Sequence, residues 1–139
     1  MPRPHIPKNL RQEVTNRARR LCEYCLVHQE DRPERHQIDH ITALKHGGTT
    51  DSENLALACV VRNKYKGSDL TSIDPLERIM VPLFNPRKQE WTEHFEITDA
   101  QINGLTAIGR ATVEILRLNA EERLIERQEL IRANRYPRN

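Results

Sequence analysis

The chain has 139 residues, of which 4% are aromatic and 30% are charged, and its formal net charge is +2. This length allows one compact domain with a small, largely aliphatic core, and the net charge alone says little about a partner. No apolar run is long enough to span a membrane and no signal-peptide segment follows Met1, so we expect no membrane association and a cytoplasmic location. Three cysteines cannot complete a set of intramolecular disulfides, which also favours a reducing compartment.

The first 21 residues predict a basic arm followed by a helix. Residues 2–7 are proline-rich and read as extended, because proline lacks the amide hydrogen that helices and sheets use. Residues 7–21 place apolar side chains on one helical face, namely Leu10, Val14, Ala18 and Leu21. Residues 1–20 carry six Lys and Arg residues against the single acid Glu13, a balance that fits a polyanionic partner or a solvated face.

The middle of the chain predicts two strands and a helix. Residues 35–44 are β-branched and partly alternating, which indicates a strand. Residues 45–54 form an obvious loop, in which Gly47 and Gly48 permit unusual backbone angles. The apolar run 55–58 is a second strand or the entry to a helix, and residues 60–70 form a short helix with Gly67 near its end.

The last 65 or so residues predict a surface segment and helices. Prolines in residues 74–87 argue for a segment that wraps the surface rather than a central strand. Residues 90–98 alternate like a strand, with Trp91 and Phe95 on one side, and residues 106–119 are helical. Asn119 with Glu122 predicts the N-cap of a final helix, whose expected buried stripe is Leu124, Ile125, Leu130 and Ile131.

Four polar residues stand out within the two strands and the helix. Asp39 and His40 are adjacent in an apolar strand, Asn54 opens the second strand, and Asn63 lies in the short helix. One carboxylate and one carboxamide oxygen suit a hard divalent cation such as Mg²⁺. An imidazole beside that cation can take a proton from water at neutral pH. The alternative is an aspartate that merely orients a strand histidine.

The segments "CEYC", "IDHITALKHGGTTDSENLALAC" and "RNKYKG" resemble the HNH endonucleases. The resemblance covers Cys22–Gly67 and includes the Asp-His pair, the Gly-Gly loop, both asparagines and the final Lys-Gly. It implies an α+β fold with a ββα-metal core, made of a two-stranded hairpin and a short metal helix. We therefore expect a single domain over residues 1–139, with a basic arm and helix (1–21), the HNH core (22–70), and a wrapping segment with C-terminal helices (71–139).

The resemblance also implies a role for each of the four residues. His40 corresponds to the general base, Asp39 and Asn63 to ligands of a catalytic Mg²⁺ or Mn²⁺, and Asn54 to the residue that pins the loop. The implied reaction is hydrolysis of phosphodiester bonds in DNA, expected to be double-stranded, by a nickase that leaves 5′-phosphate and 3′-hydroxyl ends. The alternatives are a DNA-binding module on an inactive HNH fold and a zinc-knuckle interaction protein.

Basic residues near this unit are candidate nucleic-acid contacts, since phosphates dominate the affinity of such sites. The candidates lie on the glycine loop, along the metal helix and after a proline turn: Lys45, His46, Arg62, Lys64, Lys66, Arg87 and Lys88. For each one taken singly, a solvated surface residue is the competing interpretation.

The cysteines match the family's structural zinc site only in part. Cys22, Cys25 and Cys59 stand at three of its four positions, and Arg62 occupies the fourth. Structural zinc takes four ligands, and an arginine has no lone pair to offer. The zinc site is therefore either absent or completed by another residue, for which His28 is the nearest candidate. Without zinc, the thiols would be small buried hydrophobes and Arg62 would reach a phosphate.

Overall fold

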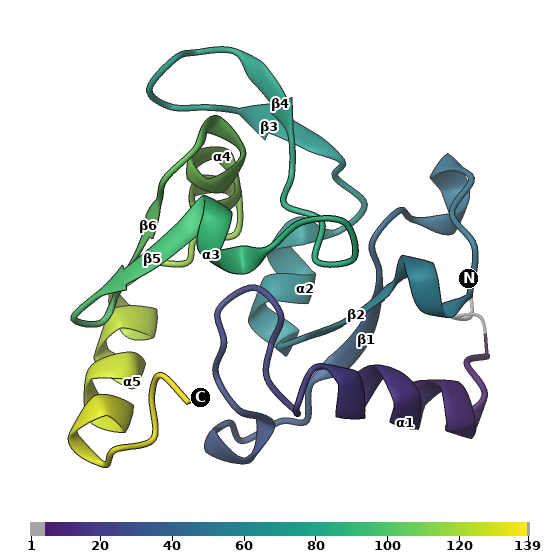
Figure 1. Cartoon of the computed structure of the whole chain (residues 1–139), viewed down its shortest axis with the longest axis horizontal. Helices are drawn as coiled ribbons and strands as arrows, with labels where there is room; N and C mark the ends of the chain where they lie inside the picture. The colour runs from purple at the N-terminus through teal and green to yellow at the C-terminus, as the bar shows by residue number, and fades with distance from the viewer. Residues whose placement is uncertain (1–4, 139) are drawn as a thin grey trace.

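The structure is a computed structural model that describes residues 5–138, so the first four residues of the predicted arm lie outside it. Figure 1 shows α1 with the β1–β2 pair on one side of the molecule and α4, α5 and the β5–β6 pair on the other, with α2 between them. The helices and strands are α1 (Lys8–Arg17), β1 (Gln37–His40), β2 (Leu55–Ala58), α2 (Val60–Lys66), β3 (Thr71–Ile73), β4 (Met80–Pro82), α3 (Trp91–His94), β5 (Phe95–Thr98), β6 (Gln101–Gly104), α4 (Ala107–Ile115) and α5 (Glu121–Arg132).

Helix α1 packs its apolar face against the β1–β2 pair. Val14 is fully buried and clusters with Leu55 and Leu57 of β2. Leu10 and the C-cap residue Ala18 pack around this cluster, which confirms three positions of the predicted apolar stripe. The helix is shorter than the predicted 7–21, because it ends at Arg17, and Leu21 lies outside it in an isolated bridge with His28. The opposite face of α1 is left to polar side chains.

Strands β1 and β2 pair antiparallel, with Asp39 opposite Ala56 and His40 opposite Leu55. Residues 55–58 are therefore a strand and not the start of a helix. The first strand is shorter than the predicted 35–44, because the Ile41 amide makes the last bond to the partner strand, at Asn54 O, and a 3₁₀ turn follows over Leu44–His46. Helix α2 follows Cys59 directly and ends at Gly67, which has a φ of +50°, as the sequence predicts.

The C-terminal half differs from the prediction in three places. The predicted strand 90–98 begins only at Phe95, because Trp91–His94 form the short helix α3. Asn119 does not cap α5, whose N-cap is Ala120. Its carboxamide instead bonds both backbone groups of Ile102, accepting from N at 2.9 Å and donating to O at 2.7 Å. In the predicted stripe of α5, Ile125 is 51% exposed.

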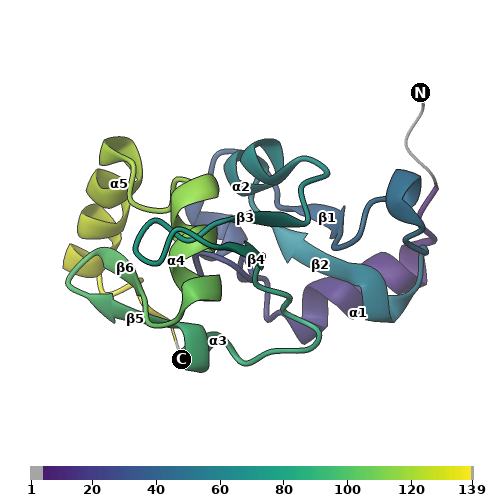
Figure 2. The ribbon, with the colours of Figure 1, turned by 90° about the horizontal axis from the view of Figure 1, so that it is seen from above.

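Other C-terminal predictions hold. Residues 106–119 contain α4, and the segment with three prolines forms the edge of a small peripheral hairpin, β3–β4, rather than a central strand. The main core lies between the two halves and includes the three cysteines, Phe84, Phe95 and Ile102. Figure 2 shows α2 between the part of the molecule with α1, β1 and β2 and the part with α4 and α5. Within residues 5–138, no helix has both the length and the apolar character that a membrane crossing requires.

Candidate functional site

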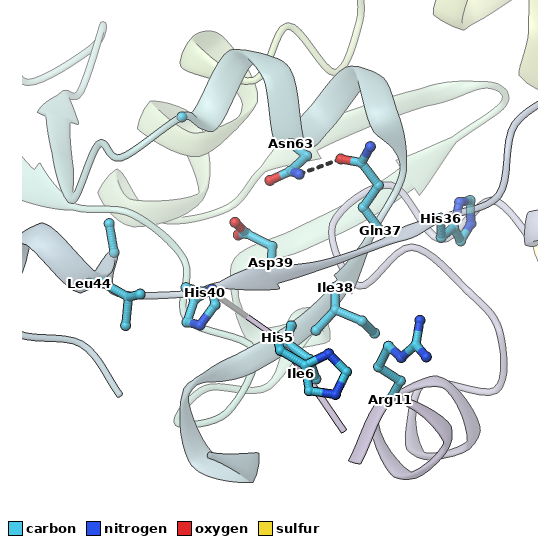
Figure 3. A pocket seen from close by; sticks show the side chains of 12 residues that line it. His5, Ile6, Arg11, His36, Gln37, Ile38, Asp39, His40, Leu44 and Asn63 are labelled. Atoms are coloured by element: carbon cyan, nitrogen blue, oxygen red, sulfur yellow. Dashed lines mark hydrogen bonds between the residues drawn. The ribbon is translucent and has the colours of Figure 1, made fainter. Parts of the chain in front are cut away.

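A cavity of about 800 Å³ opens beside β1 and contains three of the four predicted site residues. The hairpin supplies Asp39 and His40, and α2 supplies Asn63 (Figure 3). The remaining walls come from the segment before α1, from α1 and from the loop after β1. The full lining is His5, Ile6, Arg11, His36, Gln37, Ile38, Asp39, His40, Ala43, Leu44, Asn63 and Gly67.

Asp39 and Asn63 point towards one another between β1 and α2 (Figure 3). Gln37 lies two residues before Asp39 on β1, so its side chain points to the same face of the strand. Asn63 Nδ2 donates a 2.5 Å hydrogen bond to Gln37 Oε1. This bond directs the amide nitrogen of Asn63 towards Gln37 and leaves its carbonyl oxygen turned towards Asp39 (Figure 3).

These donors fit a hard divalent cation. A carboxylate and a carboxamide oxygen are ligands that Mg²⁺ accepts, and Mg²⁺ commonly retains waters and a substrate phosphate for its other positions. The Asp39 carboxylate already attracts a positive charge in the structure, since Lys66 Nζ lies 3.4 Å from its Oδ2. Asp39 and Asn63 are therefore the residues that could hold the metal.

His40 points to the opposite side of β1 from Asp39, as successive strand residues do (Figure 3). Its Nε2 lies 2.9 Å from Thr50 Oγ1 in the loop between the strands. Burial, and then the positive charge of Lys66, lower the pKa of His40 below its ordinary value. A lowered pKa keeps the imidazole neutral near pH 7, which is the form that accepts a proton.

Asn54 ties the two ends of the loop between β1 and β2. Its Oδ1 accepts from Thr42 N at 2.9 Å, and its Nδ2 donates to Thr42 O at 2.9 Å and to Thr49 O at 2.8 Å. Gly48 is required in this loop, because a Cβ there would lie 1.8 Å from Thr42 O. Since Thr50 contacts His40, the Asn54 bonds fix the loop that carries this contact.

The predicted nucleic-acid contacts fall into two groups. Lys45, His46 and Lys64 are exposed and able to meet a phosphate. Arg62 and Lys66 are buried, with 1% and 3% exposure, so their predicted contact with a phosphate does not fit the structure. Lys66 Nζ instead donates to Ile41 O at 2.9 Å, which joins α2 to the end of β1. Arg87 is largely buried and forms an ion pair with Glu23.

Cys22, Cys25 and Cys59 form a buried cluster whose sulfur atoms all lie within 4.8 Å of one another. The Sγ atoms of Cys25 and Cys59 are 3.9 Å apart, close to the separation of about 3.8 Å that two thiolates have on a tetrahedral zinc with Zn–S bonds of about 2.3 Å. Burial raises the pKa of the Cys22 thiol, whereas hydrogen bonds from Cys22 and Cys59 hold the pKa of Cys25 well below its ordinary value. The cluster fits three of the four ligands of a structural zinc.

Within the described part of the chain, no fourth Cys, His, Asp or Glu joins the thiols. The candidate His28 is not part of the cluster. Its Nδ1 accepts from Glu30 N at 3.1 Å and caps a short 3₁₀ turn. The residue at the fourth position, Arg62, points its guanidinium into the core. Its Nη1 donates to Leu116 O at 2.7 Å, just past the end of α4, where helix carbonyls lack partners.

Sequence reasoning missed Gln37 and Thr50 and gave Lys66 a different role. Gln37 orients Asn63, Thr50 contacts His40, and Lys66 links Asp39 to the end of β1. Only Gln37 had a signal in the sequence, because a residue two positions before Asp39 shares its face of the strand. The contacts of Thr50 and Lys66 depend on how the loop and α2 fold back onto β1.

Residues 22–69 match the family model described as HNH endonuclease, which confirms the resemblance found in the sequence. Members of this family are generally endonucleases that use divalent metals and act on DNA, so the match indicates a nuclease or DNA-binding function. No curated protein matches the chain. No solved structure matches it either.

Proposed function

We propose that this protein is a divalent-metal-dependent endonuclease that nicks double-stranded DNA, with β1, β2 and α2 as its ββα-metal core. The observation that carries the proposal is the arrangement of three side chains in one cavity. The side-chain oxygens of Asp39, on β1, and Asn63, on α2, point towards one another. His40 projects from the other side of β1. A metal-holding pair and a neutral base are the two components that phosphodiester hydrolysis requires.

In the proposed reaction, Asp39 and Asn63 would hold the cation beside the scissile phosphate. His40 accepts a proton from water, whose oxygen forms a bond to phosphorus. The bond between phosphorus and the 3′ oxygen breaks, and that oxygen takes a proton from solvent water and leaves as a 3′-hydroxyl, so the other end keeps a 5′-phosphate. When bound, the divalent cation stabilises negative charge on the phosphate and on the departing oxygen. Asn54 holds the loop whose Thr50 contacts His40.

The test is nicking of supercoiled plasmid by the purified protein. We expect conversion to open circles with Mg²⁺ or Mn²⁺, and none when EDTA is present in excess. A single site cuts one strand at a time, so open circles should precede linear DNA. Equal nicking with and without EDTA would contradict the proposal.

A second candidate is a DNA-binding module on the same fold without catalysis. Two observations favour it: the lost fourth cysteine, and the Lys66 ammonium that lies against the Asp39 carboxylate where a metal is expected. This module would shift plasmid mobility without nicking at any Mg²⁺ or Mn²⁺ concentration.

A further inference from the structure

A second cavity, of about 770 Å³, lies between α1 and the segment before β1. It carries four Lys and Arg side chains and no acidic one. Its lining is Lys8, Arg11, Gln12, Thr15, Asn16, Arg20, Gln29, Arg35, His36 and Ile38. We call this surface the α1 cleft.

The α1 cleft is built on the polar face of an amphipathic helix. The five lining residues that α1 supplies recur at spacings of three and four, so they form one continuous stripe opposite the apolar face that packs on β2. Within residues 5–138, Lys8, Arg11, Arg20 and Arg35 form no side-chain hydrogen bond and no ion pair. Their charges are therefore unused by the fold itself.

The α1 cleft is continuous with the cavity that holds Asp39 and His40. Arg11, His36 and Ile38 line both cavities. Figure 3 shows Arg11, on α1, below the end of β1 from which Ile38 projects. A polyanion bound at one cavity can thus extend into the other.

We infer that the α1 cleft binds backbone phosphates of the DNA duplex on one side of the scissile bond, an inference that rests on the proposed function. Helix α1 has 10 residues, a length of about 15 Å at about 1.5 Å per residue. One strand of a duplex carries a phosphate about every 3.4 Å along the axis, so this length spans about four phosphates. Cations spread along such a stripe suit an extended polyanion better than a single small anion.

The experiment measures binding rather than cleavage. A fluorescent 20-base-pair duplex is titrated with the His40→Ala protein, without divalent cation, from 50 to 200 mM NaCl. The test variant adds Arg20→Gln and Arg35→Gln, both outside the catalytic cavity. The control variant adds Arg78→Gln and Arg132→Gln instead, which makes the same change in net charge at exposed residues outside both cavities.

Each lost phosphate contact lowers the slope of log affinity against log salt by about 0.9, so we expect a loss of about 1.8 in the test variant. The parent should bind the duplex more tightly than the test variant at 50 mM NaCl. This advantage in affinity should be about tenfold smaller at 200 mM NaCl. The control should keep the parent's slope. Equal salt slopes in the test and control variants would overturn the inference. It would also be overturned if unlabelled polyglutamate displaced the fluorescent duplex as well as unlabelled duplex DNA does.

The outcome is separable from the proposed function. If the protein does not nick plasmid but the test variant loses salt dependence, the nuclease proposal fails and the cleft stands. If the wild type nicks plasmid but both double variants bind alike, the cleft fails and the nuclease stands.

Discussion

Arg62 and Asn63 are consecutive residues of α2, yet they serve two different sites. Asn63 faces the open cavity, where it meets Gln37 and the Asp39 side of the strand. Arg62 faces the core, where it donates to the carbonyl at the end of α4. The side of α2 that faces the cavity (the cavity side) has Asn63, as the HNH resemblance implies. The side that faces the core (the core side) has Arg62 where the resemblance implies a cysteine.

This difference reflects what each site requires. A catalytic metal needs oxygen donors and a base in fixed positions, and few other side chains replace them. A structural zinc site needs only to hold segments together. Arg62 joins α2 to α4 by a charge-assisted hydrogen bond, and its positive charge lies near enough to lower the pKa of Cys25 further. A buried cation thus helps to hold the core side together, whereas the cavity side keeps the candidate catalytic residues Asp39, His40 and Asn63.

The largest expected effect comes from the base on the cavity side. His40→Ala removes the proton acceptor but no proposed metal ligand, so nicking should fall by about 10²–10⁴-fold. The affinity for duplex DNA should stay close to that of the wild type. The matched control is His46→Ala, which changes an exposed histidine in the loop after β1 and should retain the wild-type rate at saturating DNA. Wild-type nicking by His40→Ala would remove His40 from the mechanism.

Asn63→Ala tests the other component of the cavity side. Loss of a ligand oxygen should weaken Mn²⁺ binding, measured by calorimetry, and raise the Mn²⁺ concentration needed for nicking. Gln37→Ala only releases the orientation of Asn63, and loss of such a supporting bond typically costs about 10–100-fold in metal affinity. We expect Asn63→Ala to be impaired at least as much as Gln37→Ala. Unchanged Mn²⁺ binding in Asn63→Ala would refute its assignment as a ligand.

On the core side, Arg62→Cys restores the fourth cysteine, and its effect on stability should depend on zinc. Loss of the Arg62 hydrogen bond costs about 1.5–3 kcal/mol, the usual worth of a bond to a charged group. Without zinc, the variant should therefore melt below the wild type. With zinc it should melt higher and respond to chelator, because metal binding contributes to folding free energy.

Arg62→Met is the control for this experiment, since it loses the same hydrogen bond but offers no thiolate. Its melting temperature should fall with or without zinc. Metal content measured by mass spectrometry shows whether the wild type already carries zinc. Tightly held, stoichiometric zinc in the wild type would show that a metal, and not Arg62 alone, holds the three thiols.

The smallest effect is expected at Lys64, an exposed residue of α2. Lys64 is exposed, whereas Lys66 is buried against β1. Lys64→Gln should lower the salt slope of duplex binding by about 0.9 and leave the melting temperature unchanged. Lys66→Gln should instead lower the melting temperature, because Ile41 O and Asp39 lose a buried cationic partner. Equal melting temperatures in the two variants would contradict this assignment.

The first strand, the short helix and the candidate catalytic residues could be predicted from the sequence, although the strand and the helix are shorter than predicted and residues 55–58 were left open between a strand and a helix entry. The signals are local in the sequence. β-branched residues indicate the first strand, and the turns are marked by Gly47, Gly48 and Gly67. The spacing of the HNH resemblance is kept by Asp39, His40, Asn54 and Asn63. The apolar stripe of α1 was also readable, because its helical period shows directly in the residues.

The positions of the buried cations, by contrast, depend on the three-dimensional fold. Arg62 and Lys66 look like surface residues in a basic stretch, but α4 and β1 supply carbonyl partners distant in sequence that allow their burial. Asn119 likewise leaves its predicted N-cap because Ile102, 17 residues earlier, offers two backbone bonds. The α1 cleft requires α1 and the segment before β1 to meet. Such contacts join segments far apart in the chain, so local composition and periodicity carry no record of them.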